Sequence, residues 1–131
     1  MQGQPTLDVT VVVPLLDEEE SLRELKAGID RVLEGLRFEV IFIDDGSQDG
    51  SWSVIEAMQQ DQPESVRGIR FARNYGKSAA LQKGFEVARG AVVFTMDADL
   101  QDDPEELPAM RSQLLEGGFG VRGGRAPRAR G

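Results

Sequence analysis

The strongest constraint on the fold is an alternation of strand-like and helix-like segments, which repeats four times along the chain. The strand-like segments are short runs rich in apolar and β-branched residues, at 7–13, 38–43, 66–72 and 92–96. Between and after them, apolar residues recur at helical intervals. Such an alternation predicts an α/β fold, in which a mostly parallel sheet has right-handed crossovers and helices on both faces.

The helix-like segments carry ordinary boundary signals. Ser21 and Glu24 have the spacing of a capping box, which predicts that a helix begins there. Asp49 is placed to cap the next helix. A third helix is expected at about 77–89, with Gly90 at its C′ position.

Prolines give further expected boundaries. Pro14 should stop the first strand, because proline has no backbone N–H to donate. Pro104 suits the start of a last helix, and Pro108 should break or restart the first turn of that helix. This helix should end at residues 117–118, and the polar residues 1–6 form an expected disordered lead-in.

Composition excludes several kinds of site. The chain has no cysteine and no histidine, which excludes disulfides, Cys/His zinc sites and His-based triads. The net charge is −8, and the last ten residues hold four arginines and no acid, so the remainder carries 11 − 23 = −12. An acidic body argues against nucleic-acid binding. No apolar run approaches the roughly 18 residues of a membrane span, and the N-terminus does not resemble a signal peptide. We therefore expect a cytoplasmic chain.

A polar cluster follows each of the four expected strands. The clusters are Asp17–Glu20, Asp44–Asp45, Arg73–Asn74 and Asp97–Asp99. Because ligands of open parallel sheets bind at the carboxyl ends of the strands, we expect these clusters to lie along one edge and to form a binding site there.

Asp97 and Asp99 are the candidate metal ligands. In an extended backbone, positions i and i+2 project to the same side, and the amide oxygen of Gln101 comes next in line. Three hard oxygen ligands suit Mg²⁺ or Mn²⁺ better than zinc. Such an ion could stabilise a diphosphate leaving group as a Lewis acid. The alternative is a strand that simply ends in an acidic, solvated turn.

Three other clusters each fit two interpretations. The Asp44–Ser47 segment is either a turn with a helix cap or a place where a carboxylate accepts the ring N–H of uracil or guanine. Arg73 and Lys77, next to Gly76 and a helix start, are either a phosphate cradle or solvated cations. Residues 14–19 are either a strand stop followed by acids that favour a helix N-terminus or part of the expected binding edge of the sheet.

Five ordered motifs together resemble family 2 glycosyltransferases, and within them the dolichyl-phosphate mannose synthase and bactoprenol glucosyltransferase group. The motifs are Val-Val-Pro-x-x-Asp-Glu-Glu, Ile-Asp-Asp-Gly-Ser-x-Asp-Gly, Arg-Asn-x-Gly-Lys, Ala-Arg-Gly and Met-Asp-Ala-Asp-Leu-Gln-Asp-Asp-Pro. The resemblance spans about residues 11–118. It implies a GT-A, Rossmann-like fold, a UDP- or GDP-sugar donor and inverting transfer to a polyprenyl or dolichyl phosphate.

Carried over by position, the resemblance also implies residue roles. The implied nucleotide-sugar-binding residues are Pro14, Leu16, Glu18, Ile43, Asp45, Arg73, Lys77, Asp97, Ala98 and Asp99. Asp97 and Asp99, with Gln101, would bind Mg²⁺ or Mn²⁺. Leu16 stands where the family often has an aromatic residue. Ile43 and Asp45 would hold the base, and Arg73 and Lys77 would lie near the diphosphate or the sugar.

The family pattern stops after residue 119. Residues 7–119 would be the nucleotide-sugar-binding half of an incomplete GT-A domain, and 120–131 a disordered Gly/Arg tail. We interpret this as a truncated or frame-shifted chain, or as a donor half made on purpose. The acceptor-side catalytic groups would be missing, so this chain alone is expected to be inactive.

Further expectations follow from an incomplete sheet and from the family. An exposed sheet edge favours self-association. The full-length relative would work at the cytoplasmic face of a membrane. Two other functions stay open: a non-catalytic nucleotide-binding module, and a metal-dependent nucleotidyltransferase, which would release pyrophosphate rather than nucleoside diphosphate.

Overall fold

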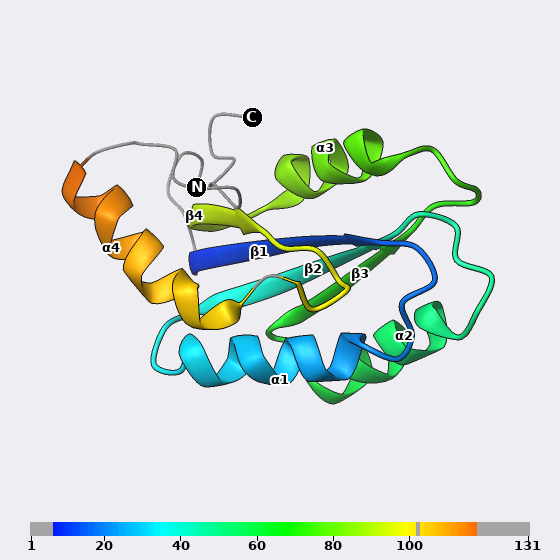
Figure 1. The fold of residues 1–131 in the computed structure, drawn as a ribbon, viewed down its shortest axis with the longest axis horizontal. Helices are drawn as coiled ribbons and strands as arrows, with labels where there is room; N and C mark the ends of the chain where they lie inside the picture. Colours follow the sequence, from blue (N-terminus) through cyan, green and yellow to red (C-terminus); the bar gives the residue numbers. More distant parts are fainter. Residues whose placement is uncertain (1–6, 102, 118–131) are drawn as a thin grey trace.

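The computed structural model describes residues 7–101 and 103–117, and its strands form one parallel sheet (Figure 1). The elements are β1 (Leu7–Leu15), α1 (Leu22–Val32), β2 (Phe38–Asp44), α2 (Ser51–Asp61), β3 (Val66–Arg70), α3 (Lys77–Val87), β4 (Gly90–Thr95), the 3₁₀-helix η1 (Pro104–Glu106) and α4 (Leu107–Gly117). The strand order is β3-β2-β1-β4, and every neighbouring pair is parallel. The predicted α/β fold is confirmed.

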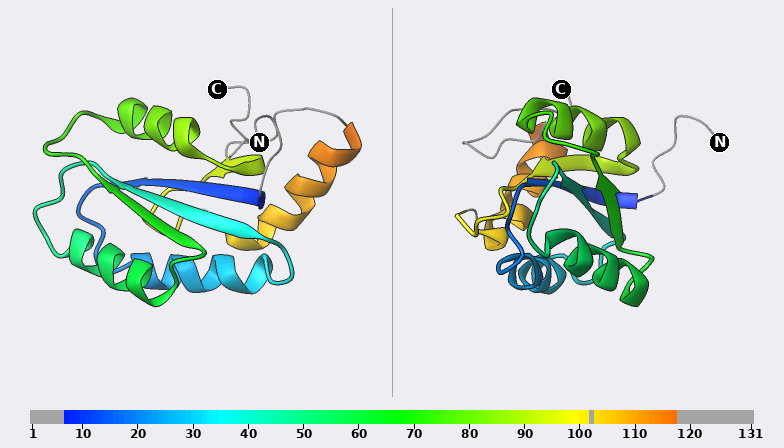
Figure 2. Two further views of the ribbon diagram at one scale, coloured as in Figure 1. Left: turned by 180° about the vertical axis from the view of Figure 1, so that it is seen from behind. Right: turned by 90° about the vertical axis from the view of Figure 1, so that its right-hand side faces the viewer.

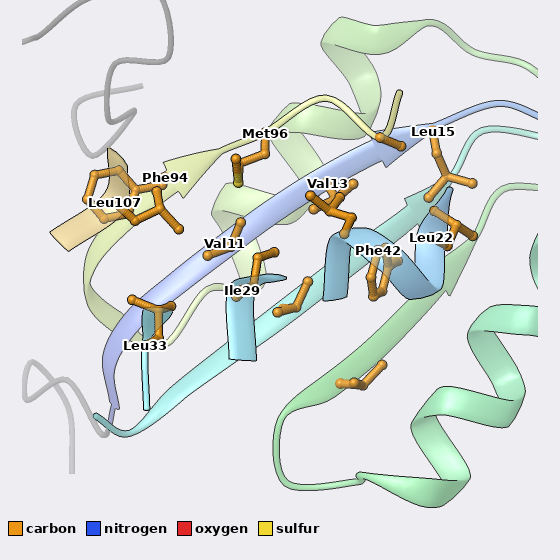
Figure 3. Packing of buried hydrophobic residues seen from close by; sticks show 14 of the residues in the cluster. Val11, Val13, Leu15, Leu22, Ile29, Leu33, Phe42, Phe94, Met96 and Leu107 are labelled. Carbon is orange, nitrogen blue, oxygen red and sulfur yellow. The ribbon is translucent and has the colours of Figure 1, made fainter. Parts of the chain in front are cut away.

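Helices cover both faces of the sheet (Figures 1 and 2). On one face, Val11 and Val13 of β1 belong to the core cluster that includes Ile29 of α1 (Figure 3). On the other face, Val12 belongs to a smaller cluster with Ala80 of α3. Because successive strand residues point to opposite faces, a strand buried on both faces needs a continuous apolar run. That requirement explains the β-branched sequence of β1.

The direction of the crossovers reverses beside β1. The connection through α1 leads to β2 on one side of β1, whereas the connection through α3 leads from β3 to β4 on the other side. Val11 accordingly pairs with Val40 of β2 and with Phe94 of β4. In open α/β sheets, ligands bind beside such a reversal, at the carboxyl ends of the strands.

The prediction that Pro14 stops the first strand was wrong. Pro14 stays in register with β2, and β1 continues to Leu15. The Val12 carbonyl accepts a hydrogen bond on the β4 side, and the Leu15 carbonyl accepts one from Asp45 on the β2 side. Successive residues of a strand direct their backbone groups to opposite sides, so the nitrogen of Pro14, which has no N–H, faces β4. The pairing between β1 and β4 has already ended at Val12. The sheet therefore loses no ladder hydrogen bond.

Two predicted helix caps had different outcomes. Helix α1 begins at Leu22 after the N-cap residue Ser21, but the Ser21 side chain makes no capping hydrogen bond, so the capping-box prediction was wrong. Its hydroxyl donates instead to the carbonyl oxygen of Ala98, in the loop after β4. The Asp49 prediction holds only in part: the N-cap residue of α2 is Gly50, but the Asp49 side chain accepts the Ser51 N–H at 2.8 Å at the start of that helix.

Gly90 is not the C′ residue of the third helix. Helix α3 ends at Val87, its C-cap residue Ala88 is extended, and Gly90 begins β4. A Cβ atom on Gly90 would lie 2.4 Å from the Thr10 backbone nitrogen. The glycine is therefore required because β4 approaches β1 very closely at this point.

The last helical segment begins as predicted. Pro104 opens the 3₁₀-helix η1, and the Asp103 side chain accepts a hydrogen bond from the Glu105 N–H at 2.9 Å. Helix α4 then restarts at Leu107, with Pro108 in its first turn. A 3₁₀ turn followed by a new helix accommodates both prolines, because neither occupies a helix interior.

The predicted lead-in at 1–6, the boundary at 119 and the tail at 120–131 lie outside the described residues. Over residues 7–101 and 103–117, no helix is long and apolar enough to cross a membrane. The sheet and its helices make up the described part of the chain and contain the candidate site.

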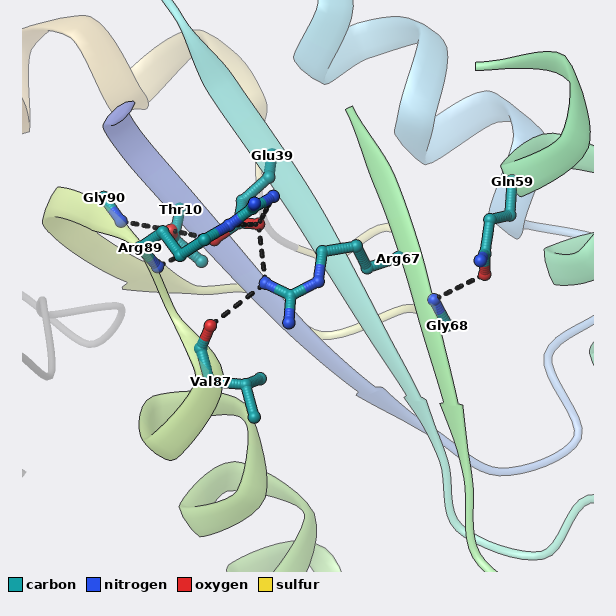
Figure 4. A network of polar contacts seen from close by, with 8 residues as sticks. All are labelled: Thr10, Glu39, Gln59, Arg67, Gly68, Val87, Arg89 and Gly90. Carbon is teal, nitrogen blue, oxygen red and sulfur yellow. Dashed lines mark hydrogen bonds and ion pairs between the residues drawn. The ribbon is translucent and has the colours of Figure 1, made fainter. Parts of the chain in front are cut away.

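A buried carboxylate ties the strands together at their amino-terminal end (Figure 4). Glu39 of β2 is fully buried and accepts hydrogen bonds from the Thr10 hydroxyl and the Arg67 guanidinium, both at 2.8 Å. The Arg89 backbone N–H donates to it at 2.8 Å, and the Arg89 guanidinium donates at 2.9 Å. Arg67 also donates to the Val87 carbonyl at 3.0 Å. This network joins β1, β2, β3 and the turn before β4.

The network also sets the ionisation of Glu39. Burial by itself raises the pKa of this carboxyl. The hydrogen bonds from Arg67, Arg89 and Thr10 together outweigh burial and hold the pKa of Glu39 below its ordinary value. Glu39 is therefore a charged group at neutral pH, compensated inside the fold.

The two edges of the sheet differ. At the β3 edge, the Gly68 N–H donates to the side-chain oxygen of Gln59 at 2.9 Å, so α2 covers a backbone donor (Figure 4). A Cβ atom on Gly68 would lie 2.5 Å from Ile55 and 3.1 Å from the Trp52 ring, which shows how closely α2 packs there. At the opposite edge, β4 pairs with β1 and with no other strand in the part of the chain that the structure describes.

Candidate functional site

A cavity of about 450 Å³ opens at the carboxyl ends of the strands. Its lining residues are Pro14, Leu15, Leu16, Glu18, Asp45, Asn74, Gly76, Lys77, Ala80, Asp97, Ala98 and Asp99. These residues end or follow each of the four strands, or belong to α3. The structure therefore brings the polar clusters to one edge of the sheet, beside the reversal at β1.

Most of the predicted nucleotide-sugar-binding residues line this cavity, but Ile43 and Arg73 do not, and neither does the predicted metal ligand Gln101. Ile43 is fully buried in the core cluster that faces α3. Arg73 lines a separate hollow, with its guanidinium 5.2 Å from the centre of the Tyr75 ring. Gln101 is exposed, and its backbone N–H donates to Asp99 at 3.2 Å.

Asp97 and Asp99 both line the cavity, but the backbone between them is not extended as the spacing argument assumed, because Ala98 and Asp99 form a turn after β4. Among the described residues, no group of three or more Asp, Glu, His or Cys side chains converges as a ready-made metal cage. Mg²⁺ is commonly held by one or two carboxylates while substrate phosphates and water complete its shell. Two carboxylates in an open cavity fit that mode of binding, and the all-oxygen donor set suits Mg²⁺ or Mn²⁺.

Lys77 reaches Asp97 across the cavity. Lys77 is the first residue of α3, and its ammonium lies 2.8 Å from Asp97 Oδ1. The preceding residue, Gly76, sets the backbone position of Lys77. Its φ of +106° favours glycine, and its carbonyl accepts the first hydrogen bond of the helix, from the Ala80 N–H. The lysine side chain, 62% exposed, extends from this anchored backbone.

The two adjacent aspartates after β2 have different surroundings. Asp44 is fully buried, and its Oδ1 accepts the Ser47 N–H at 2.7 Å, as in the turn interpretation. Asp45 lines the cavity instead, and its carboxylate accepts backbone N–H groups from Tyr75 at 2.7 Å and Gly76 at 3.0 Å. The turn interpretation therefore describes Asp44, while Asp45 is the residue available to a ligand.

The acids after β1 are divided in the same way. Asp17 Oδ1 accepts the N–H groups of Gln48 at 2.8 Å and Asp49 at 3.2 Å, and Glu19 accepts the Gly50 N–H at 2.6 Å. These two carboxylates thus stabilise the start of α2. Glu18, between them, lines the cavity.

The structure adds cavity residues that the sequence-based set lacked. Asn74 and Gly76 line the wall, although both belong to a motif quoted above. Ser21 supports the cavity wall from outside, because its hydroxyl donates to the carbonyl of Ala98, the residue between Asp97 and Asp99 in the chain. No local signal identifies Ser21, since its partner is 77 residues away in the chain.

The charges of the cavity wall are strongly unequal. The described lining residues include four acids, Glu18, Asp45, Asp97 and Asp99, and one base, Lys77. An anionic ligand such as a diphosphate would meet repulsion from this wall, so its binding requires added positive charge. A divalent cation on the carboxylates would supply it.

Known proteins share this sequence pattern. The family model described as glycosyl transferase family 2 matches residues 10–130. An undecaprenyl-phosphate 4-deoxy-4-formamido-L-arabinose transferase of Pseudomonas fluorescens is 40% identical over 125 residues, covering 94% of this chain and 37% of that protein. The transferase of the same name from Aeromonas hydrophila is 41% identical over 111 residues, covering 83% of this chain and 34% of that protein. The chain thus spans about a third of the length of these relatives.

Solved structures share the fold. A mannosyltransferase from Pyrobaculum calidifontis in complex with GDP-Man and Mn²⁺ has a TM-score of 0.72 and 27% identity, covering 85% of this chain and 34% of that one. A glucosyl-3-phosphoglycerate synthase from Mycobacterium tuberculosis, in complex with Mn²⁺, UDP and phosphoglyceric acid, has a TM-score of 0.67 and 24% identity, over 84% and 39%. The sheet has the GT-A fold of these glycosyltransferases, which confirms the resemblance. With this fold, this cavity and the match over residues 10–130, the chain belongs to glycosyltransferase family 2.

Proposed function

We propose that this chain binds a UDP- or GDP-sugar as the donor-binding part of an inverting polyprenyl-phosphate glycosyltransferase. The observation that carries the proposal is the convergence of Asp45, Lys77 and the Asp97–Asp99 pair on one cavity. The two relatives are named as undecaprenyl-phosphate transferases of a modified arabinose, which supports the acceptor class. The neighbour solved with GDP-Man and Mn²⁺ supports a nucleotide-sugar donor with a divalent cation.

The proposed donor lies along the cavity from base to sugar. Asp45 accepts the ring N–H of the base, beside Pro14 and Leu16. Lys77 donates to the diphosphate. Asp97 and Asp99 would hold Mg²⁺ or Mn²⁺. Gln101 lies outside the cavity lining, and its exposed side chain would have to turn toward the two carboxylates to become the third protein ligand.

The proposed reaction forms one bond and breaks one. A lipid phosphate oxygen attacks the anomeric carbon while the bond from that carbon to the diphosphate oxygen breaks, which inverts the configuration. The phosphate is already ionised, so it needs less general-base help than a sugar hydroxyl. Lys77 stabilises the charge of the departing diphosphate. A bound divalent cation would supply Lewis-acid stabilisation of the same charge.

Calorimetric titration of the chain with UDP and with GDP tests the proposal. With Mn²⁺ present, one of the nucleotides should bind, and chelation with EDTA should weaken its affinity by about tenfold or more, the scale of a lost charge-assisted contact. The Asp97→Asn, Asp99→Asn double variant should lose the effect of the chelator, with the same nucleotide affinity in Mn²⁺ and in EDTA. The Asp61→Asn, Glu64→Gln variant is the matched control, because it removes two exposed charges outside the cavity lining. Equal affinity of the wild-type chain with and without EDTA would contradict the metal site.

A further inference from the structure

The contact between Lys77 and Asp97 places a positive charge on a carboxylate that the proposed function assigns to a metal ion. The Lys77 ammonium lies 2.8 Å from Asp97 Oδ1. An ammonium at hydrogen-bond distance and a divalent cation on the same oxygen repel each other strongly. The two cations therefore compete for Asp97.

We propose that Lys77 is an exchangeable counter-ion of the metal site. In the donor-free protein, its ammonium neutralises Asp97. When the donor binds, the ammonium moves to the diphosphate, and Asp97 becomes available to the divalent cation. The inference rests on the proposed function, to which it adds the order in which charges change partners.

The structure gives Lys77 the means to exchange. Its backbone is anchored at the start of α3, beside Gly76, whose N–H is held by Asp45 at 3.0 Å. Its side chain is 62% exposed and that of Asp97 is 32% exposed, and ion pairs this exposed are weak. A lysine ammonium on a flexible four-carbon stem can therefore leave Asp97 without any movement of the helix.

The charge of the wall gives the exchange a direction. With Lys77 on Asp97, the neighbouring carboxylates Asp45, Asp99 and Glu18 leave the cavity acidic. A divalent cation that binds without a diphosphate must displace Lys77 from Asp97, and no ligand phosphate is then present to pair with the displaced ammonium. A diphosphate alone draws Lys77 away from Asp97 and brings its own negative charge next to that carboxylate. When both ligands bind, the diphosphate has Lys77 and Asp97 has the divalent cation, so each ligand should increase the affinity for the other.

The test uses Lys77→Met, which keeps the length of the side chain and removes its charge. The matched control is Lys83→Met on the same helix, because Lys83 lies outside the cavity lining and is 3.7 Å from Glu86. Mn²⁺ binding to nucleotide-free protein is measured from the electron paramagnetic resonance signal of free Mn²⁺. Binding of UDP and GDP in EDTA is measured by calorimetry.

Lys77→Met should bind Mn²⁺ about threefold or more tightly than the wild type, because a competing cation is gone. It should bind nucleotide in EDTA about tenfold more weakly, because a charge-assisted contact is lost. Lys83→Met should match the wild type in both. Lys77→Arg, which keeps a positive charge, should keep wild-type Mn²⁺ affinity and provides a second variant if Lys77→Met fails to fold.

Two outcomes would overturn the exchange while the proposed binding of a donor and a divalent cation stands, and the second would also remove the diphosphate role of Lys77. In the first, Lys77→Met or Lys77→Arg departs from the Mn²⁺ affinity expected of it. In the second, nucleotide affinity in EDTA does not change in Lys77→Met, so the ammonium does not move to the diphosphate. A wild-type chain that binds neither Mn²⁺ nor nucleotide overturns the proposed function, and the exchange with it.

Discussion

The backbone N–H of Tyr75 donates a 2.7 Å hydrogen bond to the carboxylate of Asp45, joining the loop after β2 to the loop before α3. Gly76 donates to the other oxygen at 3.0 Å. A carboxylate oxygen has two lone pairs, so Asp45 can accept these bonds and still accept another from a ligand. The residue that we assign to the base therefore also shapes the cavity.

The first prediction separates Asp45 from Asp44. Asp45→Ala should weaken nucleotide binding by about 1.5–3 kcal/mol, the scale of a hydrogen bond to a charged group. Asp44→Ala should lower the melting temperature, because it removes the buried acceptor of the Ser47 N–H, but should change nucleotide affinity less. Calorimetry well below both melting temperatures measures the affinities. A larger loss of affinity in Asp44→Ala would reverse the assignment.

The second prediction concerns acid stability. Burial raises the pKa of Glu39, but its hydrogen bonds outweigh burial, so the folded pKa is below the ordinary value of 4.5. A carboxyl with a lowered folded pKa contributes stability that is fully present above the unfolded pKa. This contribution is lost as the pH falls below 4.5 and through the lowered folded pKa.

Glu39→Gln should therefore lower the free energy of unfolding at pH 7 by about 3 kcal/mol, as expected when a buried ion pair loses one partner. Its free energy of unfolding should also fall less steeply below pH 4.5 than that of the wild type. Urea denaturation between pH 7 and pH 3 measures both effects. Glu86→Gln, an exposed acid on α3, is the control. Parallel pH profiles for wild type and Glu39→Gln would count against the network.

The third prediction places self-association at the β4 edge. Because the Met96 N–H donates to Val12 on β1, alternation directs the N–H groups of Ala91 and Val93 to the open side. Ala91→Pro should remove one such donor without breaking the β1–β4 ladder. Sedimentation velocity over a concentration series should show association in the wild type and in Ala91→Ser, and less in Ala91→Pro. A sedimentation coefficient independent of concentration in the wild type would exclude this association.

The fourth prediction concerns the packing of α3 on the sheet. A Cβ atom on Gly84 would lie 2.4 Å from Val12 Cγ1. Alanine is better than glycine in a helix by about 1 kcal/mol, yet Gly84→Ala should destabilise the fold by about 1–3 kcal/mol because the core is overpacked. Ser78→Ala, at an exposed position of the same helix, should have little effect. Thermal unfolding of both variants checks the difference, and a higher melting temperature for Gly84→Ala would refute the packing argument.

The sequence predicted the features that depend on local patterns. Apolar runs such as that of β1 predicted the strands, and the polar residues after each run predicted which edge carries the cavity. Pro104 and Pro108 predicted the start and the restart of the last helical segment, but not that its first part is a 3₁₀-helix. Each of these signals lies within a few residues of the feature that it predicts.

The features that the sequence did not predict depend on distant segments. Pro14 is accepted inside β1 because β4 has already diverged on the side of its missing N–H. Ser21 contacts Ala98 rather than its own helix. The division between Asp44 and Asp45 depends on the loop at Tyr75. A local sequence pattern does not specify which distant backbone segment a side chain will contact.

The Glu39 network also determines when this fold can form during synthesis. The partners of Glu39 are at positions 10, 67 and 89. A nascent chain shorter than about 90 residues therefore contains Glu39 but lacks Arg89, the second arginine that compensates the buried carboxylate. The first strand made, β1, lies at the centre of the sheet and gains its second neighbour with the last strand, β4. Long-range parallel pairing of this kind is intrinsically slow. A ribosome that stalls before β4 has emerged therefore holds a chain that cannot yet assemble its sheet, and β1 must wait for nearly the whole described chain before it is enclosed.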